Sequence, residues 1–133
     1  MKIIVDTCIW SLALRRNTVI QSETVNDLKN LILDQKVQMI GPIRQELLSG
    51  IRSTKQFNTL KSYLSAFPDL IIKIHDYELA AEFLNINMKN GIQGSNIDFL
   101  ICALSHNYDM PIFTDDNDFI KFARHIPIIL HKR

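Results

Sequence analysis

The feature that most constrains the fold is the alternation of short apolar runs with longer stretches of helical periodicity. Val25, Leu28 and Ile32 recur at the spacing of an amphipathic helix. Ile3–Val5 and Leu70–Ile74 are short and almost continuously apolar, as is typical of strands buried on both faces of a sheet. Strands that alternate with helices predict a parallel sheet covered by helices on both faces.

The expected elements follow one another with no linker and no internal repeat, in a single domain spanning residues 1–133. One domain is the usual organisation for a chain of this length. Asp76 is expected to cap the fifth helix. Strands are expected at residues 2–5, 37–40, 70–74, 111–114 and 127–130, and helices at residues 7–15, 22–35, 42–51, 54–67, 76–89, 95–107 and 116–124.

The composition excludes several classes of protein. Hydrophobic residues make up 47% and charged residues 22%, which is ordinary for a globular domain and excludes a disordered chain. No apolar run approaches the ~20 residues of a membrane span, and Asp6 comes too early for a signal peptide. We therefore expect a cytoplasmic protein without a membrane partner. Cys8 and Cys102 lie in apolar runs, so they are expected to be reduced core thiols.

Carboxylates follow two of the expected strands, at the sheet edge where ligands of parallel sheets usually bind. Asp6 comes directly after Ile3–Val5, where it has the alternative role of capping the first helix. Asp115, Asp116 and Asp118 follow the strand at 111–114. Capping and the helix dipole account for one or two of these three acids, which leaves a cation site as the further interpretation.

Two more carboxylates lie on expected helices. Asp98 begins a helix that is apolar nearly all round, and Ser95 three residues earlier gives the pair the pattern of a capping box. Glu46 lies on the helix after the second strand, where a solvated helix face is the simpler interpretation.

Taken together, the four acidic positions make a stronger case than each does alone. They are expected to meet at one edge of the sheet, where four carboxylates cannot all stay ionised without a counter-charge. Mg²⁺ and Mn²⁺ prefer such oxygen ligands, and one or two of these ions can activate water against a phosphodiester. The four histidines share no ligand spacing, so zinc is not expected.

These residues resemble the motifs of PIN domains, and in particular of the small VapC-type toxins of bacterial and archaeal toxin–antitoxin pairs. The resemblance covers essentially the whole chain in motif order and spacing. The matching segments are the Asp-Thr pair after the first strand (Asp6–Trp10), the Glu-Leu-x-x-Gly pattern (Pro42–Gly50), an Asp heading an apolar helix (Asn90–Ala103) and the closing Thr-x-Asp-x-Asp-Phe (Thr114–Phe119).

The resemblance implies a three-layer α/β/α fold around a central, mostly parallel sheet. It also implies an endoribonuclease that depends on Mg²⁺ or Mn²⁺, with a metal-activated water cleaving RNA. The expected biology is a toxin that an antitoxin protein holds inactive, often as a homodimer. The site residues implied are the acids Asp6, Glu46, Asp98 and Asp116, with Asp118 as a fifth member or a substitute for Asp116, and the supporting residues Thr7, Ser95 and Thr114.

The charge balance is consistent with an RNA substrate. Removing four site acids from the 14 acidic residues leaves ten against 15 basic ones, a surface suited to a polyanion. Many PIN relatives carry an Arg before the third Asp; here Lys89 stands nearby and lacks the bidentate fork of Arg. The other basic residues expected to border the site are Arg15, Arg16, Arg44, Arg52, Lys55 and Lys61.

Two alternatives remain at this point. A PIN-like module that binds RNA or a protein partner without cutting would share the same motifs. A receiver-like domain phosphorylated on Asp would share the size and the Mg²⁺ site. Such a domain normally has a pair of acids after its first strand, whereas Asp6 stands there alone.

Overall fold

The computed structural model describes residues 1–15 and 22–132. In this part of the chain, three strands form a parallel sheet in the order β2-β1-β3. Ile3 lies opposite Val37, and Ile4 lies opposite Ile112. The central strand is buried at all three positions, as its apolar sequence predicts. The strands are β1 (Ile3–Val5), β2 (Val37–Gln38) and β3 (Ile112–Phe113).

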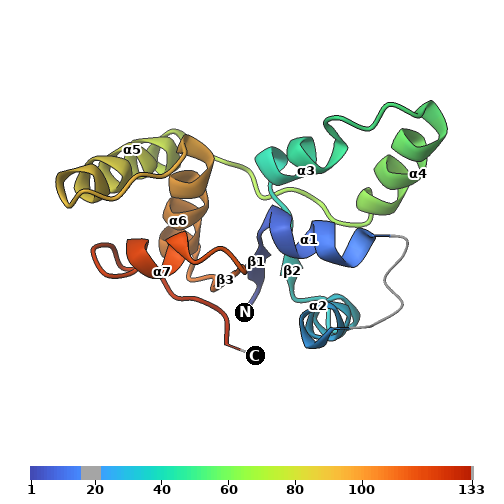
Figure 1. Cartoon of the computed structure of the whole chain (residues 1–133), viewed down its shortest axis with the longest axis horizontal. Coiled ribbons are helices and arrows are strands. Elements are labelled where there is room, and N and C mark those ends of the chain that lie inside the picture. The colour runs from blue at the N-terminus through green and yellow to red at the C-terminus, as the bar shows by residue number, and fades with distance from the viewer. Residues whose placement is uncertain (16–21, 133) are drawn as a thin grey trace.

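Helices enclose this sheet in the expected α/β/α arrangement. Figure 1 shows the strands in the middle of the molecule, with α1 to α4 on one side and α5 to α7 on the other. No helix in the described part of the chain is both long and apolar enough to span a bilayer. The helices are α1 (Thr7–Leu14), α2 (Glu23–Leu33), α3 (Gly41–Leu48), α4 (Thr54–Leu64), α5 (Ile74–Lys89), α6 (Asn96–Tyr108) and α7 (Asp118–Phe122).

Side chains that accept hydrogen bonds from the first turn explain where several helices begin. Asp6 caps α1, and the hydroxyl oxygens of Ser22 and Ser53 accept from the third residue beyond them at the starts of α2 and α4. Ser95 does the same for α6, and Phe99 to Ser105 of that helix are all buried. The caps expected from sequence at Asp6 and Ser95 are therefore confirmed, and Ser22 and Ser53 are caps that the structure adds.

Gly94 lets α6 begin close to α7. A Cβ atom at this position would lie 2.6 Å from Cζ of Phe122 and 2.8 Å from Cε2 of Phe99. The two rings pack against each other with centroids 4.6 Å apart. Glycine is needed here because its missing side chain leaves room for that pair, which fixes the chain just before Ser95.

Two expected strands are wrong. At 70–74, parallel pairing is limited to a bridge between Met39 and Asp69, and Ile71 and Ile74 are each 78% exposed. The Lys73 amide donates to the Asp76 carboxylate instead of joining the sheet, so α5 already begins at Ile74.

At 127–130, the chain likewise makes only a parallel bridge, between Ile112 and Leu130. The Ile112 amide donates to the Ile129 carbonyl, and the His131 amide donates to the Ile112 carbonyl. This short pairing places His131 next to Asp27 of α2, with 2.9 Å between Nε2 and Oδ2. The end of the chain is thus fastened to β3 and α2 without forming a strand.

Asp76 is not the N-cap expected for α5, because it lies in the first turn and is fully buried. Its Oδ2 accepts from the Lys73 amide at 2.9 Å and from the Tyr108 hydroxyl at 3.0 Å, and its Oδ1 accepts from Asn107 at 2.8 Å. Burial alone would raise the pKa of Asp76, but these hydrogen bonds and the nearby His75 lower it below its usual value. This carboxylate ties the start of α5 to the end of α6.

Replacing Asp76 by Asn should lower the free energy of unfolding by about 2 kcal/mol near neutral pH, because an amide group would face one of these donors. The pKa of Asp76 is depressed in the fold, so its stabilisation is present above the unfolded pKa of about 4. That stabilisation is lost as the pH falls through the lower folded value.

Urea unfolding between about pH 6 and about pH 2 should therefore show the difference between the two proteins shrinking as the pH falls. Glu78→Gln, an exposed carboxylate on the same helix, is the matched control and should show no such difference. A gap for Asp76→Asn that stays constant across this range would contradict the role assigned to its charge.

Candidate functional site

The carboxylate of Asp6 is held at the carboxyl end of β1 by two hydrogen bonds. Its Oδ1 accepts from the Thr7 amide at 2.8 Å, so the residue also serves as the N-cap of α1. Its Oδ2 accepts from the Thr114 hydroxyl at 2.8 Å. Oδ1 has room for a second partner, so the group is oriented and still available to a ligand.

Thr114 connects Asp6 to the loop after β3. While its hydroxyl donates to Asp6, its oxygen accepts from the Asp116 amide at 3.0 Å. The Asp116 carboxylate accepts in turn from the Asp118 amide at 2.9 Å, which fixes the entry to α7. The ends of β1 and β3 are therefore joined as the sequence predicts for neighbouring parallel strands.

Asp98 combines the two roles that sequence analysis left open. Its Oδ2 accepts from the Ser95 amide at 3.0 Å, and its own amide donates to the Ser95 hydroxyl at 3.1 Å, which completes the capping box. Burial raises the pKa of Asp98 most, and the charges of Asp6 and Asp116 raise it further against these hydrogen bonds. Asp6 and Asp116 are therefore near enough for their charges to act on Asp98.

The other two acids of the 115–118 segment have separate surroundings. The Asp115 amide donates to the Cys8 sulfur at 3.4 Å, and its side chain is exposed. Asp118 lies in the first turn of α7 with its Oδ1 3.7 Å from Nζ of Lys121, an exposed pair. Asp116 is the member of this trio whose charge acts on Asp98.

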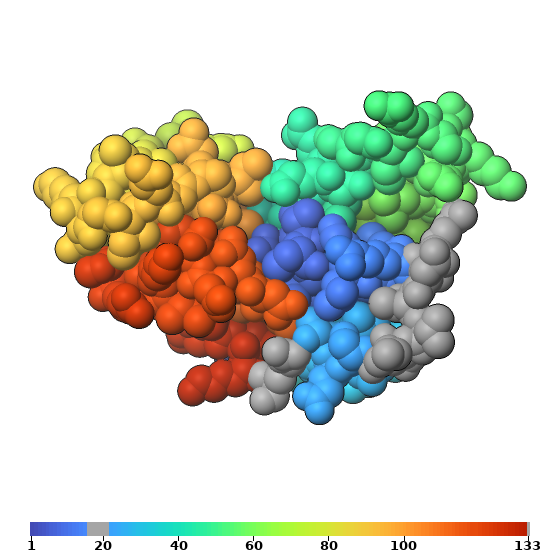
Figure 2. Space-filling model, viewed as in Figure 1, coloured from blue at the N-terminus to red at the C-terminus, as the bar shows by residue number. Residues whose placement is uncertain are grey.

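Glu46 is the expected site residue that neither the hydrogen bonds of Asp6 and Asp116 nor the charges acting on Asp98 include. It is exposed on α3, in the sequence between Ile43 and Leu47, which are the buried residues of that helix. Figure 1 places α3 beside α1, on the far side of a gap from the start of α6. Figure 2 shows the surface hollowed between these two parts of the molecule.

Cys8 is a neighbour of the site that sequence analysis misplaced in the core. Its sulfur lies 3.6 Å from Oδ2 of Asp6 and 3.6 Å from the Thr114 hydroxyl, and the residue is exposed. Partial burial of the thiol and the charge of Asp6 raise the pKa of Cys8. Its position in the first turn of α1, two residues after Asp6, is the signal that indicates this location. Cys102 is buried, as expected.

The supporting residues act differently from one another. Thr7 holds Asp6 through its backbone amide, while its hydroxyl is buried with no hydrogen-bond partner in the described ranges. Ser95 and Thr114 act through their hydroxyls, as described above. Within residues 1–15 and 22–132, no three acidic, histidine or cysteine side chains converge closely enough to hold an ion by themselves.

Among the basic residues, Arg44 does not border the site as a free cation. Its guanidinium contacts the Leu64 and Phe67 carbonyls and the Asp69 carboxylate. Arg16 lies outside the described residues. The exposed basic residues of the remaining set are Arg15, Arg52, Lys55, Lys61 and Lys89.

Two variants of Asp98 separate capping from charge repulsion. Asp98→Asn retains an oxygen that can accept from Ser95 but removes the negative charge, so in EDTA it should be at least as stable as the unaltered protein. Asp98→Ala also loses the cap, so its free energy of unfolding should be about 1 kcal/mol lower than that of Asp98→Asn. Urea unfolding in EDTA measures both. An Asn variant as unstable as the Ala variant would contradict the repulsion.

Comparisons with solved structures agree with this architecture. The chain is similar to the crystal structure of FitAcB from Neisseria gonorrhoeae, with a TM-score of 0.78 and 21% identity over 98% of this chain and 96% of that one. It is similar to VapBC2 from Rickettsia felis bound to a promoter DNA fragment, with a TM-score of 0.78 and 18% identity over 98% of both chains. It is also similar to FitAB bound to the IR36 DNA fragment, with a TM-score of 0.78 and 21% identity over 97% of this chain and 93% of that one.

At these identities the structural matches establish a shared fold. No curated protein matches the chain in sequence. The PIN domain family matches residues 3–125, a range that contains β1, β3 and all four acidic positions. The chain therefore belongs to the PIN domain family.

Proposed function

We propose that this protein is an endoribonuclease dependent on Mg²⁺ or Mn²⁺ and the toxin of a toxin–antitoxin pair. The observation that supports this most is that the Thr114 hydroxyl joins Asp6 to the Asp116 amide at one edge of the sheet, where the charges of both acids act on Asp98. Membership of the PIN family supports it too, since PIN domains are generally nucleases. The same membership removes the receiver-like alternative.

The donor set fits a hard divalent cation. The candidate ligands are carboxylate oxygens, with no histidine among them, which is the donor chemistry that Mg²⁺ and Mn²⁺ prefer. When bound, such an ion supplies an activated water and neutralises charge on the phosphodiester. Asp6, Asp98 and Asp116 would hold it, and Glu46 would complete the acidic set from α3.

The chain's own contacts prepare these groups. Thr114 turns the Asp6 carboxylate and anchors the Asp116 backbone, so both acids are placed before any ligand arrives. Ser95 orients Asp98 through the capping box. The proposed role of these residues is to hold the carboxylate oxygens in place before an ion binds. Less entropy is then lost when the ion binds.

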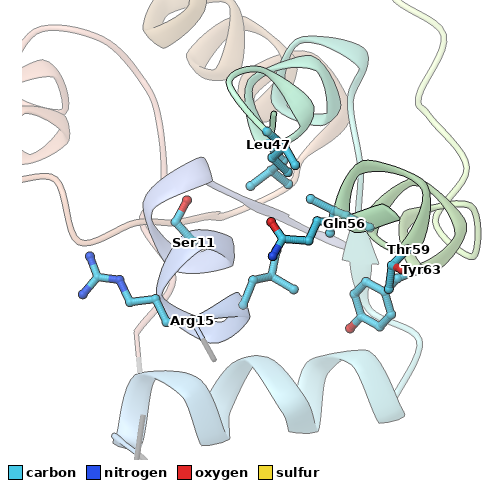
Figure 3. Close-up of a pocket in the computed structure, with 9 residues that line it drawn as sticks. Ser11, Arg15, Leu47, Gln56, Thr59 and Tyr63 are labelled. Carbon is cyan, nitrogen blue, oxygen red and sulfur yellow. The ribbon is translucent and has the colours of Figure 1, made fainter. Parts of the chain in front are cut away.

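A groove supports an antitoxin partner. Its volume is about 640 Å³, and it lies between α1, α4 and the end of α3 (Figure 3). The walls are mainly apolar, with Leu14, Leu47, Leu60 and Tyr63 among them, which suits one face of an amphipathic segment. The neighbouring structures are named as two-component complexes, VapBC2 and FitAB, which agrees with a partner of this kind. A segment seated here would touch Leu47, next to Glu46.

The homodimer stays a prediction from the family resemblance. Ile71, Ile74 and Tyr77 at the start of α5 are exposed apolar side chains that a second copy would cover. A cytoplasmic location likewise stays a prediction.

Metal dependence is the first test of the proposal. The protein should cleave RNA in Mn²⁺ or Mg²⁺ and stop in EDTA. Asp6→Asn should lose about 100-fold or more, because even groups behind a metal ligand typically contribute 10–100-fold. The Asn variant, purified in parallel, also controls for contaminating nuclease. Cleavage undiminished in EDTA would refute the mechanism, and failure to cut any RNA in Mn²⁺ would favour the silent binding module.

A second test concerns the substrate. If Arg52 and Lys55 contact RNA phosphates, the paired change Arg52→Gln and Lys55→Gln should weaken RNA binding and flatten its salt dependence by about 0.7 in log–log slope per lost contact. Binding is measured by fluorescence anisotropy with Asp6→Asn protein, which does not cut the probe. The matched control is Lys29→Gln with Lys36→Gln, two exposed charges on α2 and before β2. Equal slopes for both pairs would exclude this RNA surface.

A further inference from the structure

Arg44 on α3 is 25% exposed, and all three nitrogens of its guanidinium make contacts. Its Nε and Nη2 lie 3.1 and 2.9 Å from Oδ1 of Asp69. Its Nη1 donates to the Leu64 carbonyl at 3.0 Å, and Nη2 also donates to the Phe67 carbonyl. The cation therefore closes the carboxyl end of α4, where a positive charge is favourable.

The same contacts join α3 to the edge of the sheet. The Leu70 amide donates to the Met39 carbonyl at 3.0 Å, and Asp69 pairs with Met39 just beyond β2. Oδ2 of Asp69 also lies 3.7 Å from where a Cβ of Gly41 would stand, at the start of α3. Asp69 thus lies between the end of β2 and the start of α3. Through Arg44 it is also linked to the end of α4.

The geometry of α3 relates Arg44 to Glu46. Ile43 and Leu47 are its buried residues, so they define the stripe that faces the core. At 3.6 residues per turn, Arg44 and Glu46 are about 200° apart and flank this stripe on opposite sides. Because Arg44 reaches the end of α4, Glu46 lies on the flank turned away from α4.

Figure 1 shows α6 on that other side of α3, and Asp98 lies in the first turn of α6. Figure 2 shows the hollow between them. The packing of Ile43 and Leu47 places α3 against the core, and no side chain caps the start of this helix. The Arg44 contacts add a second fixed point on α3, so they bear on which way Glu46 faces.

We propose that Arg44 is a positioning residue: by fastening α3 to the end of α4 and to Asp69, it keeps Glu46 turned toward Asp6, Asp98 and Asp116. The proposal rests on the cation site of the proposed function. It assigns Arg44 a role in the acidic site in place of contact with RNA, which its bound guanidinium does not permit.

The test measures Mn²⁺ affinity by titration calorimetry, together with melting in EDTA. Arg44→Lys keeps the charge but loses the planar fork, and should weaken Mn²⁺ binding about 10-fold, as does Glu46→Gln. In the Glu46→Gln background, Arg44→Lys should cause no further loss, because the carboxylate it positions is gone. Asp69→Asn should resemble Arg44→Lys. Arg124→Lys, an exposed change at the end of α7, is the matched control.

The outcomes separate this proposal from the function on which it rests. Arg44 would be purely structural if Arg44→Lys lowered Mn²⁺ affinity equally with and without Glu46. The same would follow if Arg44→Lys and Asp69→Asn both lowered the melting temperature and left Mn²⁺ affinity unchanged. Unchanged affinity in Glu46→Gln would also overturn the proposal. Absence of Mn²⁺ binding by the unaltered protein, or binding unaffected by Asp6→Asn, would overturn the proposed function itself and this inference with it.

Discussion

The constraint on which the rest of the structure depends is the gathering of like charges at the carboxyl edge of a short parallel sheet. Three carboxylates close enough to raise the pKa of Asp98 are unfavourable in the absence of a counter-charge. The fold tolerates them because each also accepts a hydrogen bond from the start of a helix or turn. Asp6 caps α1, Asp98 completes the capping box of α6, and Asp116 accepts from the first residue of α7.

Structure and proposed chemistry therefore use the same atoms. The Thr114 hydroxyl connects both strand ends, donating to Asp6 and accepting from the Asp116 amide. Buried apolar strands bring those ends together, and the close packing allowed by Gly94 sets the start of α6. Glu46 lies on a separate helix, α3, which Arg44 fastens to the end of α4 and to Asp69, so the proposed acidic set would draw on two separately anchored parts of the molecule.

Much of this arrangement was predictable because it depends on local patterns. An acid directly after a buried strand, or Ser followed by Asp three residues later, indicates its own position. The failures have a common physical cause, since they depend on contacts distant in sequence. The run at 70–74 is apolar enough for a strand, but Asp76, which Asn107 and Tyr108 hold at the end of α6, accepts from the Lys73 amide and starts a helix there. Arg44 looks like a surface cation until the carbonyls of Leu64 and Phe67 are placed beside it.

The central claim is that Asp6, Asp98 and Asp116 hold a divalent cation together. Anomalous scattering from a crystal of the protein grown with Mn²⁺ tests it most directly, because it locates the ion without reference to activity. We expect an anomalous peak at the carboxyl edge of the sheet, within about 2–2.5 Å of oxygens from Asp6 and at least one of the other two carboxylates. A peak elsewhere, or none there at a Mn²⁺ concentration that supports cleavage, would contradict it.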